Sequence, residues 1–163
     1  MSSRVFLLSP AYAGGRRAKL LLGERAKFPL AVRFRREGAA LGELYAFLSG
    51  LYFRGKLAYA EAFAAPPLGV PKTLVITPGC GLVPPETVIS LPQFQAMATI
   101  PIDVTDARYL RPLVEHARIV DEVCGAGCAL ILLGSIASAK YIGPLLEMFG
   151  DRLLFPSLNF RGK

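Results

Sequence analysis

Residues that bind metals or form disulfides are scarce in this sequence of 163 residues. It has one histidine and three cysteines, Cys80, Cys124 and Cys128, with no second Cys/His group at zinc-ligand spacing. We therefore expect no metal and no cofactor. An odd number of cysteines without an export signal disfavours a disulfide framework and favours a reducing, cytoplasmic location. The single His116 lies in a predicted helix, which disfavours a Cys-His nucleophilic pair.

Long apolar runs are also absent, although 53% of the residues are hydrophobic. Gly, Pro or a charged residue interrupts every stretch before it reaches the roughly 20 residues that cross a bilayer. The apolar core near the start, residues 5–8, is shorter than that of a secretory signal peptide. We expect a protein that is neither exported nor in a membrane, with one compact domain over residues 1–163.

Acidic residues are few in the first 63 positions, where 11 Arg and Lys stand against 4 Glu. The remaining positions carry 8 basic and 8 acidic residues, so the whole excess of positive charge belongs to the first part. Such an asymmetry indicates an anionic partner, which could be nucleic acid, a nucleotide phosphate or an acidic protein.

Short apolar runs alternate with segments of helical composition. The runs predict buried strands at residues 4–9, 73–77, 129–133 and 153–155. The helical segments are expected at residues 16–22, 29–37, 41–48, 52–64, 92–98, 110–124 and 137–149. We also expect residues 100–104 to be extended, and Asp103 or Asp106 to cap the long helix that follows. This order predicts an α/β fold, a three-layer α/β/α sandwich with a mainly parallel four-stranded sheet.

Ligands of such a sheet bind beyond the carboxyl ends of its strands. This rule selects the loops at residues 10–17, 78–85, 134–140 and 156–163. Glu86, at one margin, is the nearest carboxylate, which disfavours acid-base chemistry by paired carboxylates.

Two of these loops carry candidate anion-binding groups. Gly14 and Gly15 precede Arg16 and Arg17, a turn in which the backbone can approach an oxyanion, although a solvated basic helix start is the alternative. In the loop after the third strand, Ser135 and Lys140 could hold a phosphate. Ser138 and Lys140 also have the S-x-K spacing of Ser/Lys nucleophilic catalysis, a spacing common by chance, and Ser135 could simply cap a helix.

The loop after the second strand contains the turn Gly79-Cys80-Gly81. A reactive thiolate needs a nearby base or cation, and the sequence places none there. We therefore expect Cys80 to be structural, with the Gly79 to Gly81 amides as possible hydrogen-bond donors.

Two segments, GELYAFLSGLYFRGKLAYAEAFA and TLVITPGCGLVPPETVISL, together resemble a family of small uncharacterised bacterial and phage domains. These domains are similar to the lyase-type domain of archaeosine synthase and, more distantly, to the uracil-DNA glycosylase-like fold. The matching positions are Tyr45, Phe53, Arg54, Tyr59, Gly81 and Leu82. The resemblance covers about half of the chain and implies a three-layer α/β/α domain with a four-stranded sheet.

The chain departs from the family at three places. Cys80 stands where related domains often have histidine, and Ser9-Pro10-Ala11 stands where they have a cysteine-serine-lysine cluster. Gly134-Ser135 replaces the His-Pro loop of the glycosylases, and no Asp or Asn follows the first strand as a water activator. The resemblance therefore implies the glycosylase-like fold without implying glycosylase activity.

From this pattern we expect an enzyme or an enzyme-derived domain that handles a nucleobase or a nucleotide, either free or within a nucleic acid. Arg16, Arg17 and Lys140 would bind phosphate, and Tyr45 or Tyr59 would stack on the base or hydrogen-bond to it. The full expected substrate-binding set is Tyr45, Arg54, Tyr59, Gly79, Cys80, Gly81 and Ser135. The alternatives are a non-catalytic nucleic-acid-binding module that uses the basic first 63 residues, and an interaction domain for an acidic protein.

Overall fold

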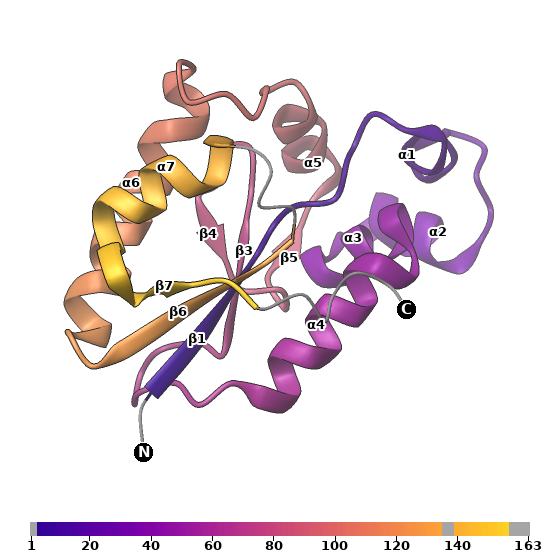
Figure 1. Cartoon of the computed structure of the whole chain (residues 1–163). Helices are drawn as coiled ribbons and strands as arrows, with labels where there is room; N and C mark the ends of the chain where they lie inside the picture. The colour runs from indigo at the N-terminus through magenta and orange to yellow at the C-terminus, as the bar shows by residue number, and fades with distance from the viewer. Residues whose placement is uncertain (1–2, 135–138, 157–163) are drawn as a thin grey trace.

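The computed structural model describes residues 3–134 and 139–156, with the backbone alone for residues 139–141. Its main sheet has five strands in the order β4-β3-β1-β6-β7 (Figure 1). Parallel pairing joins β1 (Ser3–Leu8) to β3 (Thr73–Ile76) and to β6 (Cys128–Leu133), and β6 to β7 (Leu153–Leu154). The predicted α/β class and the four predicted strands are confirmed.

The prediction of four strands in the sheet is wrong by one. The fifth strand, β4 (Leu82–Val83), runs antiparallel to β3 and forms one edge of the sheet (Figure 1). Two residues make no apolar run of their own, so the sequence pattern could not reveal this strand. Residues 100–104, expected to be extended, form a loop and a turn.

Helices cover both faces of the sheet (Figure 1). Alternate residues of β1 face opposite sides: Phe6 and Leu8 pack in one core cluster, and Val5 and Leu7 pack in the other. The first cluster includes residues of α3 (Leu41–Ser49) and α4 (Leu51–Phe63). The second includes residues of α6 (Ala107–Cys124) and α7 (Ala139–Phe149). The predicted helical layers are therefore confirmed.

The long helix α6 begins three residues earlier than expected. Asp106 caps it, since its Oδ1 accepts a hydrogen bond from the Arg108 amide at 2.9 Å. Pro112 consequently lies inside the helix and not in its first turn.

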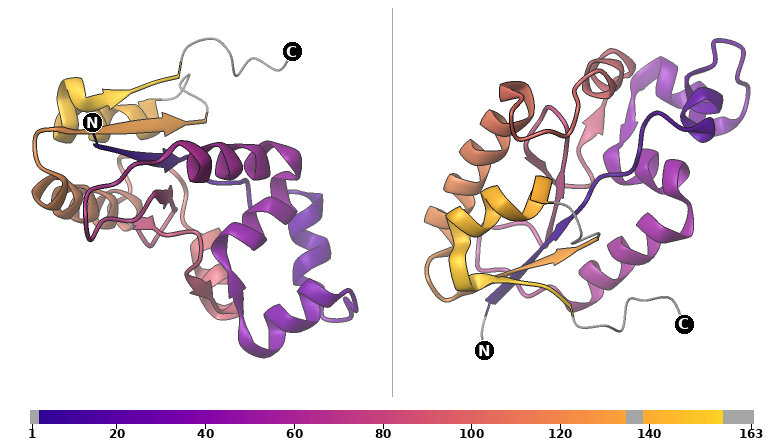
Figure 2. Two further views of the ribbon diagram at one scale, coloured as in Figure 1. Left: turned by 90° about the horizontal axis from the view of Figure 1, so that it is seen from below. Right: turned by 45° about the horizontal axis from the view of Figure 1, so that its top comes forward.

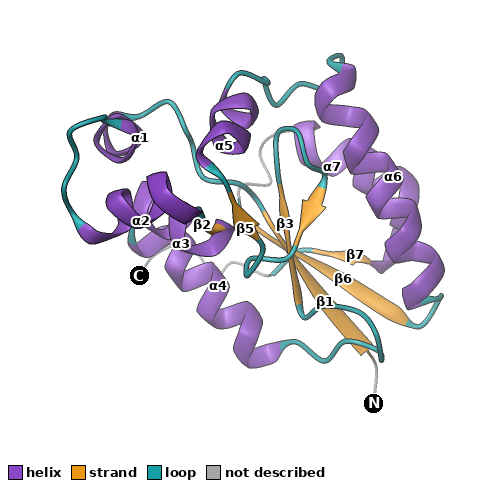
Figure 3. Cartoon of the chain, turned by 180° about the vertical axis from the view of Figure 1, so that it is seen from behind, coloured by secondary structure: helices purple, strands orange, loops and turns teal. Residues whose placement is uncertain are grey.

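The remaining elements lie near the carboxyl edge of the sheet or flank it. Helices α1 (Arg16–Leu22) and α2 (Pro29–Glu37) project from the body of the molecule beyond the end of β1 (Figure 2). Further along the chain, α5 (Leu91–Ala98) follows a small antiparallel sheet of β2 (Ala39–Ala40) and β5 (Val88–Ile89) (Figure 3). The 3-10 turn η1 (Gly150–Arg152) leads into β7. No helix in the described ranges is long and apolar enough to cross a membrane.

Candidate functional site

Ser9 occupies the carboxyl end of the central strand β1. Its amide donates to the Leu133 carbonyl of β6 at 3.0 Å, which extends the parallel ladder one residue beyond β1. The residue is 6% exposed, so its hydroxyl lies just beneath the surface of the edge where ligands of parallel sheets bind.

Lys56 reaches this serine from the first half of α4. Its Nζ lies 2.8 Å from the Ser9 Oγ and 3.2 Å from the Ser9 carbonyl oxygen. Only 5% of the lysine is exposed. Ser9 and Lys56 thus form a buried pair, the Ser9–Lys56 pair, between residues 47 positions apart in the sequence.

The charge of Lys56 has no acidic counterpart within residues 3–134 and 139–156. The described ion pairs involve other cations, and burial alone lowers the pKa of Lys56 to about 8. Aromatic rings provide part of its surroundings, with Nζ 4.7 Å from the Tyr52 ring centre and 5.3 Å from the Phe53 ring centre. A pKa of about 8 leaves about a tenth of the amine neutral at pH 7, far more than for an ordinary lysine, and the neutral amine can accept a proton.

Gly134, which directly follows β6, leaves room for the serine side chain. Its φ of +138° is a conformation that side-chain-bearing residues rarely adopt. A Cβ at this position would overlap the Ser9 Oγ. The Ser9 hydroxyl can therefore occupy its place only because residue 134 is glycine.

An aromatic stripe on α4 flanks the pair. Tyr52 precedes Lys56 by one helical turn, and Tyr59 and Phe63 follow it at helical spacing on the same side of the helix. The Tyr52 ring is 60% exposed while it lies against the Lys56 amine. Tyr59 and Phe63 are also exposed, with ring centres 4.6 Å apart. An exposed ring therefore adjoins the buried amine.

The three expected phosphate-binding residues have different surroundings. Arg16 is exposed at the start of α1. Arg17 instead donates to the Phe47 carbonyl at 2.8 Å and lies over the Phe47 ring, so it holds α1 against α3. Lys140 belongs to the first turn of α7, but its side chain lies outside the described part of the chain, as does all of Ser135. Ser138, of the S-x-K spacing, also falls outside it.

Of the aromatic and cationic residues expected to bind substrate, one is buried and two are exposed. Tyr45 is 1% exposed within the core, where its ring packs edge-on against Phe53. This burial argues against a role for Tyr45 in stacking on a ligand. Tyr59 and Arg54 are exposed on α4.

The Gly79-Cys80-Gly81 turn follows β3, at the carboxyl ends of the strands. Hydrogen bonds with the Thr77 side chain hold it. Thr77 Oγ1 accepts from the Cys80 amide at 2.9 Å and donates to the Gly81 carbonyl at 2.8 Å. The Cys80 amide is therefore not free to bind a ligand. Burial raises the pKa of the half-buried Cys80 thiol, which disfavours a thiolate nucleophile as expected.

His116 connects α6 to the edge strand β4. Its Nδ1 lies 3.0 Å from the Leu82 amide nitrogen and accepts its hydrogen bond. The ring also packs against Gly81, where a Cβ would collide with it. The histidine therefore holds the turn and β4 against the helix.

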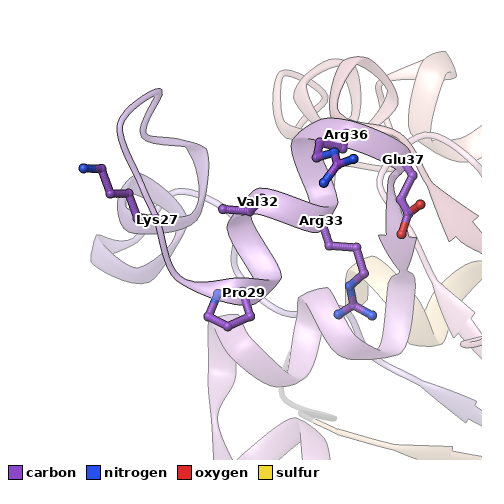
Figure 4. Close-up of a pocket in the computed structure, with 6 residues that line it drawn as sticks. All are labelled: Lys27, Pro29, Val32, Arg33, Arg36 and Glu37. Atoms are coloured by element: carbon purple, nitrogen blue, oxygen red, sulfur yellow. The ribbon is translucent and has the colours of Figure 1, made fainter.

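A surface hollow of about 470 Å³ lies at α2 (Figure 4). Its lining residues are Lys27, Pro29, Val32, Arg33, Arg36 and Glu37. The Arg33 guanidinium in it pairs with both Glu43 carboxylate oxygens, at 2.6 and 3.3 Å. None of the lining residues belongs to the strand edge, so the hollow and the pair are separate features.

Comparisons with protein-family models, with curated proteins and with solved structures gave no match to this chain. The site is therefore defined by its own geometry. In the described ranges, no group of three His, Cys, Asp or Glu side chains could hold a metal ion.

The sequence-based prediction missed the Ser9–Lys56 pair, although the sequence contains one signal for it. Lys56 is the single cation on a helix side formed otherwise by Tyr52, Tyr59 and Phe63. A lysine on an aromatic stripe is a candidate for burial, and its neighbours then decide its chemistry. The serine at the end of the first strand was visible in the sequence, but its contact with α4 was not.

Proposed function

We propose that this chain is an enzyme that acts on a nucleobase or nucleotide, free or in a nucleic acid, at the carboxyl edge of the sheet. The Ser9–Lys56 pair is the observation that carries this proposal. A buried lysine bonded to a strand-end serine, with no acidic partner in the described ranges, supplies a proton acceptor and a hydroxyl at the place where ligands bind.

The energetics of the pair support a functional role over a structural one. Burying a cationic amine without a counter-charge costs folding stability, whereas an apolar side chain of similar length would stabilise the same place. Groups with such shifted pKa values cluster at functional sites. A substrate anion would also provide the missing counter-charge.

The surroundings of the pair support a nucleotide as the substrate. The exposed Tyr52 ring beside Lys56 offers a surface on which a base can stack. The exposed Arg16 and Arg54 add positive charge in the part of the chain that carries the whole excess. Tyr52 thereby takes the stacking role first expected of Tyr45 or Tyr59. The similarity to archaeosine synthase-like domains and a glycosylase-like fold stays a prediction.

A binding screen tests this proposal. Purified protein is titrated by calorimetry with nucleosides, nucleoside monophosphates and short single-stranded DNA and RNA. We expect one of these classes to bind. Tyr52→Ala should weaken binding about fivefold or more, because stacking on one aromatic side chain contributes roughly 1–3 kcal/mol. Lys56→Met should also weaken binding, because it removes the amine that would pair with a substrate anion. Lys72→Met, which removes an exposed lysine, is the control and should leave binding unchanged. Binding of none of these ligands would refute the proposal.

A second candidate is a nucleic-acid-binding module, which the cations of α1 and α2 favour. Arg17, Arg33 and Arg35 are bonded within the protein. The exposed side chains with no bond in the described ranges are Arg16, Lys19, Arg25, Lys27 and Arg36. If these contact a phosphate backbone, binding should fall steeply with salt and depend on Arg16 and Arg36 more than on Lys56.

A further inference from the structure

We infer that Ser9 is a nucleophile, that Lys56 is its general base, and that the reacting group of the substrate is the carbonyl of an acyl ester. This inference rests on the proposed function for the nucleotide part of the substrate. The acyl chemistry itself follows from the geometry of the pair.

The contacts of the Lys56 amine place it to act as a base. As an ammonium it donates to both Ser9 oxygens, and once neutral it can accept the hydroxyl proton instead. A neutral amine has two N–H donors and one lone pair. One donor is satisfied by the Ser9 carbonyl oxygen at 3.2 Å, and the lone pair can then accept the Ser9 hydroxyl proton across the 2.8 Å contact. The Tyr52 and Phe53 rings provide no competing proton acceptor of carboxylate strength. The amine is therefore held toward the serine oxygen, as a general base must be.

The serine oxygen is also held at a defined place at the end of β1. The Oγ is fixed between Lys56 and the side-chain-free Gly134, a positioning residue that would displace it if it carried a Cβ. Serine-lysine pairs are a known variant of the activated serine nucleophile. In that chemistry the serine oxygen attacks an acyl carbonyl, which is the reacting group that we assign to the substrate.

The reaction balances without a further reactant except water. As the Ser9 Oγ bonds to the carbonyl carbon, Lys56 takes the hydroxyl proton and the carbonyl π electrons move to oxygen. The tetrahedral intermediate then breaks the ester C–O bond, and the Lys56 ammonium returns the proton to the leaving alkoxide. Water attacks the acyl-serine with Lys56 again as base. The released Ser9 oxygen regains the proton, and a carboxylic acid leaves.

The test is labelling of the whole chain with an alkyl fluorophosphonate, which modifies activated serines. Intact mass and peptide mapping should show one adduct on Ser9, absent in Ser9→Ala. General-base catalysis contributes about 100-fold or more, so Lys56→Met should slow labelling by that factor. Lys56→Gln provides a second variant if Lys56→Met folds poorly, and circular dichroism checks both. Ser49→Ala, which removes a half-buried serine on α3, should label normally.

The outcomes separate this inference from the proposed function. Labelling of Ser9 that depends on Lys56 supports the nucleophile even if no nucleotide binds or protects it. Absence of an adduct in the folded protein, an adduct on Lys56 or elsewhere, or equal rates in the Lys56 variants would overturn it. Nucleotide binding that depends on Lys56 would leave the proposed function standing in those cases.

Discussion

Lys56 destabilises the folded state at neutral pH, because the fold holds its amine away from water and from any described carboxylate. The shift of its pKa from 10.5 to about 8 corresponds to roughly 3 kcal/mol of lost stability while the group is charged. A stripe of apolar residues would accept a methionine in the same place. A functional role of Lys56 would explain why the protein has a lysine here despite the loss of folding stability.

Replacement of this lysine should consequently stabilise the protein. We expect Lys56→Met to raise the free energy of unfolding at pH 7 by about 1–3 kcal/mol, measured by urea denaturation. The substitution removes the buried charge and keeps a side chain of similar length. Lys72→Met should change it by less than about 0.5 kcal/mol, because that lysine is exposed. A clear destabilisation by Lys56→Met would show that the amine contributes to folding.

The same shift predicts a pH dependence of known sign. The folded-state pKa of Lys56 lies below its unfolded value, so between pH 8 and 10.5 the unfolded state binds more protons. The penalty is present in full below about pH 8 and disappears as the pH rises toward 10.5. The stability difference between Lys56→Met and the unmodified protein should therefore shrink from pH 7 to pH 10. A constant difference would contradict the assigned cause.

Gly134 offers a second test at the residue scale. Gly134→Ala should destabilise the protein by about 1–3 kcal/mol, because alanine would adopt an unfavourable backbone conformation and its Cβ would overlap the Ser9 hydroxyl. Thermal unfolding measures the change. Gly127→Ala is the matched control, since nothing lies within 4 Å of a Cβ there.

At the scale of elements, strands formed by continuous apolar runs could be predicted, and the shortest could not. Residues 129–133 consist only of Ala, Ile and Leu, and they form most of β6. By contrast, β4 depends on the turn after β3 and on His116, which contacts it from 34 residues away. The Ser9–Lys56 pair likewise depends on residues far apart in the sequence, because it forms only when α4 packs along β1. Arg17 is a further example, since this cation of α1 donates to a carbonyl of α3 that lies 30 residues away and that no local pattern reveals.

The His116 contact can be tested as a link between elements. His116→Ala should lower the free energy of unfolding by about 1–3 kcal/mol, because it leaves the Leu82 amide without its acceptor. Hydrogen exchange should show the Leu82 amide losing protection while amides of β1 keep theirs. Unchanged protection of Leu82 would mean that this bond does not hold β4.

For the molecule as a whole, the charge asymmetry predicted from the sequence separates into two groups of cations. Arg17, Arg33 and Arg35 hold α1, α2 and α3 together, whereas other basic side chains of α1 and α2 are exposed beyond the carboxyl edge of the sheet. The Ser9–Lys56 pair lies at that edge too. An anionic substrate would therefore meet positive charge before it reaches the buried amine.

The central claim is that Lys56 is a buried, weakly basic amine bonded to Ser9. Its most direct test is an NMR titration of the lysine side-chain carbon and nitrogen signals, with Lys56 assigned by comparison with Lys56→Met. We expect the Lys56 signal to titrate near pH 8. A Lys56 signal that titrates near the ordinary value of 10.5 would contradict it.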